Sequence, residues 1–166
     1  MNKLKIEDYS IKKSSFAEIR TNHIFGEKSL HSTKSFEPKD LIARFIINET
    51  LIQPNYLSIQ ASEYKHCMVD PEYLHYINHS CDPNCFFDMD EMILLCIKSI
   101  KIGDEFRFFY PSTDWNMIQP FNCICQAKGC LGSIQGSMFL ESSILKKYKL
   151  SRYVNEMVNQ KISISR

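Results

Sequence analysis

The sequence of 166 residues lacks several features that would assign it directly to a class. It has no apolar run near the roughly 18 residues that a membrane span needs. Lysine plus arginine (20) nearly balance aspartate plus glutamate (19), and the resulting net charge of +1 argues against nucleic-acid binding through bulk charge. The lysines of residues 1–8 precede no apolar stretch, so this segment does not resemble a secretory signal. We therefore expect an intracellular protein without membrane contact; cytoplasm, nucleus and export to a host stay open, as does the oligomeric state.

Composition and cysteine content favour a compact reduced domain. With 44% hydrophobic and 23% charged residues, a largely disordered chain is excluded. The seven cysteines are odd in number and accompany no export signal. Such thiols more often stay free or bind metal than pair as disulfides.

Apolar patterning predicts strands at residues 41–47, 92–97 and 105–110, with a turn around Gly103-Asp104 between the last two. Asp70-Pro71 resembles the cap and first residue of a short helix over residues 71–76.

A helix is expected near the C-terminus, because one helical face collects apolar residues and Ser151 stands where a cap would. These apolar residues are Leu150, Tyr153, Val154, Met157 and Val158. We expect this helix to pack on the body of the domain.

Charge is unevenly distributed along the chain. Residues 66–97 contain six acidic side chains and no lysine or arginine, whereas residues 141–166 are mainly basic. Both runs are most simply solvated faces. The acidic run also contains the polar residues 78–84, so the other interpretation is a negative rim that attracts a cationic ligand to them.

The strongest local signal is Asn78-His79-Ser80-Cys81-Asp82-Pro83-Asn84. This run offers many hydrogen-bond donors, one imidazole and one thiol, whereas a plain turn needs one or two such residues. Taken alone, it also fits a polar loop with a satisfied histidine.

A second signal is the cluster Cys123, Cys125 and Cys130, which places three thiols within eight residues. Zinc in structural sites takes four ligands in a tetrahedron and favours thiolates. Three local cysteines therefore need a fourth ligand, for which Cys81 in its polar, turn-rich loop is the candidate. A disulfide and unbound thiols are the alternatives.

The third signal is Gly103-Asp104-Glu105, followed by an aromatic segment that ends in Tyr110-Pro111. Because a strand cannot continue normally through Pro111, Tyr110 stands at a strand end beside a bend. A tyrosine there packs in the core or points its hydroxyl into a pocket.

Together the three segments resemble the SET-domain family of protein lysine methyltransferases. Members carry Asn-His-Ser-Cys-x-Pro-Asn, then Gly-(Asp/Glu)-Glu before a strand ending in tyrosine, and many end in a post-SET Cys-x-Cys-x4-Cys cluster. All three occur here in that order, and the resemblance covers about residues 20–136. The glycines of the family's Gly-x-Gly are replaced by Glu27 and Ser29.

The resemblance implies a mainly β SET-domain fold of small curved sheets with a pseudoknot, short helices and a C-terminal helix. It divides the chain into a SET domain (1–118), a post-SET zinc segment (119–136) and a C-terminal helical extension (137–166).

The resemblance also implies S-adenosyl-L-methionine as cofactor and a lysine-containing protein or peptide as substrate. Tyr110 is the expected catalytic residue. The expected cofactor contacts are Lys28, Ser29, Leu30, Asn78, His79 and Trp115. The alternative for Trp115 is packing in the core or between loops. Cys81, Cys123, Cys125 and Cys130 are expected to hold a structural Zn²⁺. Cys67, Cys85 and Cys96 are expected to be small buried residues.

Three other functions compete with methyl transfer. One is a catalytically weak SET-like module that binds a lysine-bearing tail, which the replaced glycines favour. Another is a zinc-bearing nucleic-acid reader, which only the C-terminal basic stretch favours. The third is a thiol hydrolase that uses Cys81 and His79, although nothing in the spacing supplies an oxyanion site.

Overall fold

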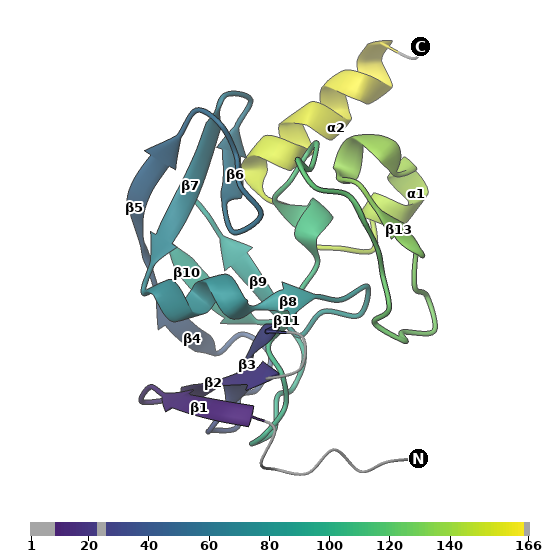
Figure 1. Cartoon of the computed structure of the whole chain (residues 1–166). Coiled ribbons are helices and arrows are strands. Elements are labelled where there is room, and N and C mark those ends of the chain that lie inside the picture. The colour runs from purple at the N-terminus through teal and green to yellow at the C-terminus, as the bar shows by residue number, and fades with distance from the viewer. Residues whose placement is uncertain (1–8, 23–25, 165–166) are drawn as a thin grey trace.

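Short strands form most of the regular structure in the computed structural model, which describes residues 9–22 and 26–164 (Figure 1). Residues 1–8, where no secretory signal is expected, lie outside the described residues. Three antiparallel sheets have the strand orders β1-β2-β3, β4-β10-β9 and β5-β7-β6. Their strands are Tyr9–Lys13 (β1), Ala17–Asn22 (β2), Lys28–Ser32 (β3), Leu41–Arg44 (β4), Ile46–Leu51 (β5), Ile59–Ser62 (β6), Lys65–Asp70 (β7), Cys85–Asp88 (β9) and Ile93–Cys96 (β10).

Two short strand pairs and a few helices complete the molecule. β8 (Asn78–His79) is parallel to β11 (Arg107–Phe108), and β12 (Phe121–Asn122) is antiparallel to β13 (Ser133–Ile134). The helices are the 3-10 turns η2 (Glu72–Tyr76), η3 (Tyr110–Ser112) and η4 (Ser137–Phe139) and the α-helices α1 (Ser142–Leu145) and α2 (Arg152–Ile164). The fold is mainly β with a C-terminal helix, as predicted. No described helix has the length and apolar character needed to cross a bilayer.

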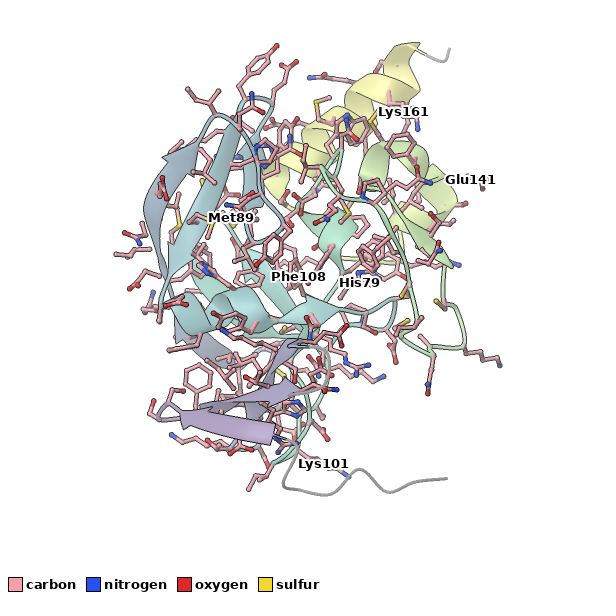
Figure 2. The ribbon with its side chains drawn as sticks, viewed as in Figure 1. His79, Met89, Lys101, Phe108, Glu141 and Lys161 are labelled. Carbon is pink, nitrogen blue, oxygen red and sulfur yellow. The ribbon has the colours of Figure 1, made fainter. Side chains whose placement is uncertain are left out.

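The β8–β11 pair lies between the N-terminal sheet and the C-terminal helices (Figure 1). The pairing places the residues before Tyr110 beside Asn78 and His79, which is the juxtaposition that the pseudoknot expectation requires. Figure 2 labels Phe108 of β11 and His79 of β8, which are partners in this pair. Phe16 and Phe106 belong to the main hydrophobic core, and Phe36 packs edge to face against both. Such ring pairs add stability beyond the apolar area that they bury.

Residues 41–47 form parts of two strands rather than the single strand predicted. β4 ends at Arg44 and β5 begins at Ile46, and the two strands belong to different sheets. Between them Phe45 is buried, and its amide donates to the carbonyl of Met92. A continuous apolar run has no periodicity that would reveal such a break. The strand predicted at residues 92–97 is confirmed as β10.

Two predicted element ends are wrong. Asp70 is the last residue of β7 rather than a helix cap; Pro71 precedes the 3-10 turn η2, which has no side-chain cap. The strand predicted at residues 105–110 is shortened to β11, because Tyr110 already begins the turn η3 with Pro111.

The C-terminal helix is confirmed as α2. Ser151 stands just before it, and its hydroxyl accepts a hydrogen bond from the amide of Val154 at 3.3 Å. This bond satisfies one of the amides that a helix N-terminus leaves unpaired. Val154 is fully buried, so the helix packs on the body of the domain.

Candidate functional site

The polar motif after residue 77 is fastened to the segment around Glu105 by backbone and side-chain hydrogen bonds. The amide of Ser80 donates to the carbonyl of Phe108, and the amide of Asn84 donates to that of Arg107. The Asn84 side chain donates to the carbonyl of Glu105 and accepts from the amide of Arg107. The Asn84 side chain therefore links two segments that are far apart in sequence.

His79 links the tyrosine at the strand end to the cysteine of the motif. Its Nδ1 accepts from the backbone amide of Tyr110 at 3.3 Å, so the ring proton lies on Nε2. Nε2 is 3.4 Å from Sγ of Cys81 and can donate to it. Burial lowers the pKa of His79 to about 4, so the ring is neutral at physiological pH. Neutral His79 can therefore hold both partners at once.

Asn78 organises a charged network at the mouth of a cavity. Its side-chain amide donates to the carbonyl of Lys28 at 3.1 Å and to Oε1 of Glu105 at 2.9 Å. Arg107 contacts the other carboxylate oxygen of Glu105 at 2.6 Å. The Lys28 ammonium lies 4.6 Å from the ring centroid of Tyr76 and donates to its hydroxyl.

These side chains line a wide cavity of about 880 Å³. Its wall comes from β3, η2, β8, the segment around Glu105 and the first residues after Asn122. Polar and charged groups are prominent in this wall, as the network above requires. The cavity is thus suited to a polar ligand of substantial size.

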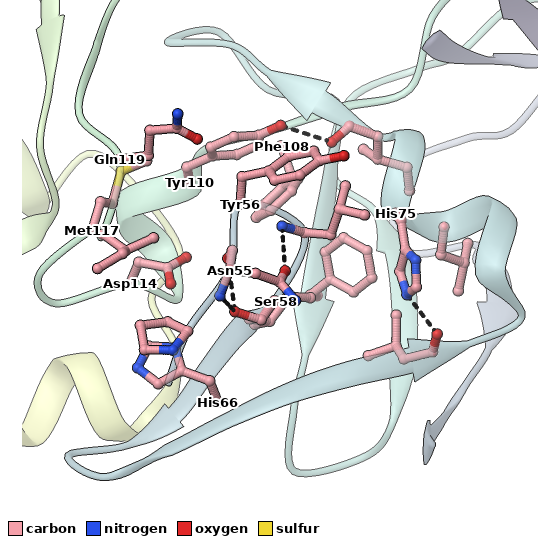
Figure 3. A pocket seen from close by; sticks show the side chains of 18 of the residues that line it. Asn55, Tyr56, Ser58, His66, His75, Phe108, Tyr110, Asp114, Met117 and Gln119 are labelled. Carbon is pink, nitrogen blue, oxygen red and sulfur yellow. Dashed lines mark hydrogen bonds between the residues drawn. The ribbon is translucent and has the colours of Figure 1, made fainter. Parts of the chain in front are cut away.

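A second cavity of about 300 Å³ also has Tyr110 in its wall (Figure 3). It is lined mainly by apolar side chains, among them Ile77, Phe87 and Phe108. Its polar members are Asn55, Ser58, His66, His75, Asp114 and Gln119. Five residues line both cavities: Tyr56, Leu57, His75, Tyr110 and Phe121. The two cavities therefore share the wall that contains the Tyr110 ring.

Tyr110 is held at this shared wall by an aromatic cluster. The centroid of the Tyr110 ring lies 4.7 Å from that of Phe108, 5.3 Å from that of His79 and 6.0 Å from that of Phe121. The Tyr110 hydroxyl donates to the carbonyl of Ile77 at 3.3 Å. Burial raises the pKa of Tyr110, and the nearby carboxylates of Asp114 and Glu105 add to the effect. The hydroxyl is therefore protonated at neutral pH.

The four expected metal ligands come together in space. The sulfur atoms of Cys81, Cys123, Cys125 and Cys130 all lie within 4.8 Å of one another. The amide of Leu131 donates to Sγ of Cys81. An all-thiol group of this size suits zinc. Cys67, Cys85 and Cys96 are buried elsewhere, as predicted.

The C-terminal segment is tied to the same loop. Tyr148 stacks on Phe109 with ring centroids 3.7 Å apart, and its hydroxyl donates to the carbonyl of Cys81 at 2.9 Å. Two contacts thus connect the chain before α2 with the loop that contains Cys81 and with the neighbour of Tyr110.

The predicted site residues separate into two groups. Lys28, Asn78, His79 and Tyr110 line the wide cavity. Ser29, Leu30 and Trp115 do not line it: the Leu30 side chain is 1% exposed and belongs to the core.

The backbone of Trp115 is hydrogen-bonded to residues of β6 and η4. Its amide donates to the side chain of Gln60 and its carbonyl accepts from Met138. Gly136 lies so close that a Cβ there would be 2.5 Å from the Trp115 carbonyl oxygen. The aromatic residue that reaches the cavity is Phe121, which lies two residues before Cys123 in the sequence.

The acidic run of residues 66–97 is partly neutralised within the chain rather than presented as a free negative rim. Asp82 pairs with Lys98 at 2.6 Å, Asp88 with Lys149 at 3.4 Å and Asp90 with Arg152 at 3.0 Å. Two of the basic partners come from the C-terminal basic stretch, so the uneven charge distribution serves contacts inside the molecule.

Comparison with known proteins finds relatives that are named as methyltransferases. Methyltransferase flvH of Aspergillus flavus is 46% identical over 85 residues, which are 50% of this chain and 48% of that protein. A histone-lysine N-methyltransferase of Gibberella zeae, H3 lysine-36 specific, is 29% identical over 129 residues, 64% of this chain and 14% of that protein. This chain thus spans about half the length of the first relative and less of the second.

Among solved structures, the methyltransferase domain of human PR domain-containing protein 2 is 18% identical. The match has a TM-score of 0.39 and covers 62% of this chain and 77% of that one. The family model of the SET domain matches residues 7–111, a span that includes Lys28, the Asn78-His79 motif and Tyr110. Because that match extends over more than half of the 166 residues, the chain belongs to the SET-domain family.

Proposed function

We propose that this protein is an S-adenosylmethionine-dependent methyltransferase that moves a methyl group to a lysine side-chain amine of a protein. The observation that carries the proposal is the meeting of two cavities of different polarity at Tyr110. One partner of a methyl transfer can then enter from each cavity, and the reacting atoms can meet beside Tyr110, where the surrounding aromatic rings limit the access of water. Alignment of two partners in this way supplies much of the rate enhancement in such reactions.

The wide polar cavity is assigned to the cofactor, which supplies a methyl group bound to a sulfonium cation. Lys28, Asn78 and His79 are the proposed contacts, and Ser29 and Leu30 fix Lys28 in place through their pairing in β3. The Glu105 carboxylate and the Arg107 guanidinium add one charge of each sign to this wall. A zwitterionic ligand finds partners for both of its charged ends there.

The smaller apolar cavity is assigned to the acceptor amine. A free lysine has a pKa of about 10.4, yet the attacking nitrogen must be neutral. Removal from water beside a sulfonium cation favours the neutral amine through desolvation and like charge. The Tyr110 hydroxyl is proposed to orient the nitrogen lone pair or the methyl group, for which its protonated state suits it.

The four clustered cysteines are proposed to hold a structural Zn²⁺. Four thiolates leave no open coordination position, so the metal would not activate water. Its role would be to fasten the segment after Asn122 to the loop at Cys81, which closes one wall of the wide cavity. On this proposal residues 1–118 form the SET domain, 119–136 the post-SET segment and 137–166 the C-terminal extension.

Lysine as the acceptor is supported by the name of the Gibberella relative, and methyl transfer by the names of both relatives. The second candidate is a catalytically weak module that binds a lysine-bearing tail. The observation that favours it is the replacement of the family's Gly-x-Gly by Glu27 and Ser29, since Glu27 lines the wide cavity.

Calorimetric titration with S-adenosylmethionine distinguishes the two candidates. An enzyme binds the cofactor, and Asn78→Ala weakens that binding at least tenfold because the link between Lys28 and Glu105 is lost. Asn116→Ala, an exposed position outside both cavities, serves as the control. Incubation with isotope-labelled cofactor and a panel of basic proteins, followed by mass spectrometry, then identifies the acceptor. Absence of cofactor binding by the folded protein would favour the binding module.

A further inference from the structure

The smaller cavity contains one carboxylate among mainly apolar side chains. Asp114 follows η3 and lines the cavity together with Tyr110 (Figure 3). No lysine or arginine is found among the described residues that line it, and no described ion pair involves Asp114. A carboxylate in apolar surroundings without a counter-ion is unfavourable unless a ligand supplies the positive charge.

The carboxyl of Asp114 is held in place on two sides. The hydroxyl of Thr113 donates to it at 2.9 Å, and the backbone of Gln60 stabilises its ionised form through a hydrogen bond. Burial has the larger effect and raises the pKa of Asp114 to about 7. A cation beside Asp114 would lower this pKa and so favour the ionised carboxylate.

His66 provides a second polar group in the same cavity. Its Nδ1 is buried and has no hydrogen-bond partner among the described residues, while the side chain is 7% exposed. His66 is directly opposite Gln60 in the β6–β7 register, and opposite residues of an antiparallel pair project on the same face. The backbone of Gln60 contacts Asp114, so the strand position opposite His66 adjoins the carboxylate. His66 and Asp114 line the same cavity, and Figure 3 shows the two side chains near each other.

We propose that Asp114 is the cation-binding group of the acceptor cavity, where its carboxylate receives a primary ammonium with His66 as the second hydrogen-bond partner. The inference rests on the proposed function, because it concerns the cavity assigned to the acceptor. A primary aliphatic ammonium is common to a peptide lysine and to a small free amine, and it is the form in which either enters from water. The neutral amine that methyl transfer needs forms afterwards, beside the sulfonium cation. The methylenes of the ammonium suit the apolar wall, and its three N–H groups suit a carboxylate and an imidazole.

Trp115 is the only tryptophan and adjoins Asp114, so its fluorescence can report on the cavity. The probe is n-butylammonium chloride at pH 8, and n-butanol is the neutral probe of similar shape. Wild-type protein is expected to bind the ammonium at least tenfold more tightly than the alcohol, and Asp114→Asn is expected to lose that preference. Asp88→Asn, which removes a carboxylate that does not line the cavity, is expected to keep it.

A measurement on the wild-type protein keeps the test independent of any variant. Ammonium binding is expected to rise between pH 5.5 and 8.5 as the carboxyl ionises, whereas alcohol binding stays constant. The other titratable groups that face Asp114 across the cavity or through Gln60 are Tyr56, His66, His75, Tyr110 and Tyr153. His66→Gln is expected to weaken ammonium binding and leave the midpoint of this rise unchanged.

Equal binding of ammonium and alcohol by the wild-type protein, or an unchanged preference in Asp114→Asn, would overturn the proposal. Cofactor titration on the same samples tests the methyltransferase proposal separately, so the two can fail independently. A lysine peptide that binds more tightly than n-butylammonium identifies a protein acceptor, and a peptide that binds no better identifies a small amine.

Discussion

At the scale of single residues, Tyr110 owes its position to its ring and its proposed role to its hydroxyl. The ring packs against Phe108, His79 and Phe121, and these contacts do not involve the oxygen. The hydroxyl makes one long hydrogen bond, at 3.3 Å to the Ile77 carbonyl. Removal of the oxygen should therefore leave the local structure intact.

We expect Tyr110→Phe to bind S-adenosylmethionine nearly as well as the wild-type protein but to turn over at least about tenfold more slowly, a loss of roughly 1.4 kcal/mol in transition-state stabilisation. Calorimetry and initial rates on the same preparations measure the two effects. Tyr64→Phe is a matched control because Tyr64 is exposed and lines neither cavity. Unchanged turnover would remove Tyr110 from the mechanism.

Asp114 leads to a prediction about the pH dependence of stability. Its folded-state pKa of about 7 lies above the ordinary value of 3.8, so the folded protein binds more protons between these values than the unfolded chain. Stability contributed at this position is present at low pH and is lost as pH rises toward 7. Asparagine at this position does not titrate.

Between pH 5 and pH 8, the free energy of unfolding of the wild-type protein should therefore fall by about 2–3 kcal/mol relative to that of Asp114→Asn. Urea titrations of both proteins at the two pH values measure the difference. A difference between the proteins that does not change with pH would show that the carboxyl titrates normally.

At the scale of elements, the attachment of α2 depends on its first turn. Ser151 is buried, and its hydroxyl accepts from the amide of Val154, which is itself fully buried. Loss of such a cap leaves a buried donor unpaired.

We expect Ser151→Ala to lower the free energy of unfolding by about 1 kcal/mol. Ser163→Ala, near the exposed end of the same helix, should change it by less than about 0.5 kcal/mol. Urea unfolding followed by circular dichroism measures both variants. Equal stability of the two variants would mean that the cap contributes nothing.

Elements with local signals were predictable from the sequence, whereas features made by distant residues were not. The spacing of Cys123, Cys125 and Cys130 predicted a metal site with Cys81 as the fourth candidate ligand, and the four sulfur atoms do lie together in the fold. The helical face around Val154 likewise predicted α2. Each of these patterns lies within a short stretch of sequence, where chemistry and periodicity can be read directly.

The second cavity shows why the remainder was not predictable. Three of its polar members, His66, His75 and Asp114, are isolated residues in otherwise unrelated segments, and only the fold brings them together. Phe121 was missed in favour of Trp115 because both are aromatic residues between Tyr110 and Cys123. Composition alone does not decide which of the two faces the cavity. The contacts of Gly136 and Gln60 with the Trp115 backbone decide it.

At the scale of the whole molecule, the C-terminal part is joined to the SET domain by interactions of different kinds. Two ion pairs connect Asp88 and Asp90 with Lys149 and Arg152, and the Phe109–Tyr148 stack adds apolar contact. Exposed ion pairs typically contribute less than about 1 kcal/mol each. The cysteine cluster is therefore expected to be the dominant link, since metal binding free energy becomes folding free energy in such segments.

Metal removal should consequently affect regions beyond the cluster. We expect purified protein to contain about one zinc per chain. Chelation or Cys125→Ser should reduce that content below half and lower the melting temperature by several degrees.

Either treatment should also weaken binding of S-adenosylmethionine, because Cys123 and Cys125 line the wide cavity and Cys81 contacts His79. Cys67→Ala, a buried thiol outside the cluster, should keep its zinc. Metal analysis, thermal unfolding and calorimetry measure the three effects. Cofactor binding that survives complete loss of zinc would show that the wide cavity forms without the metal-linked segment.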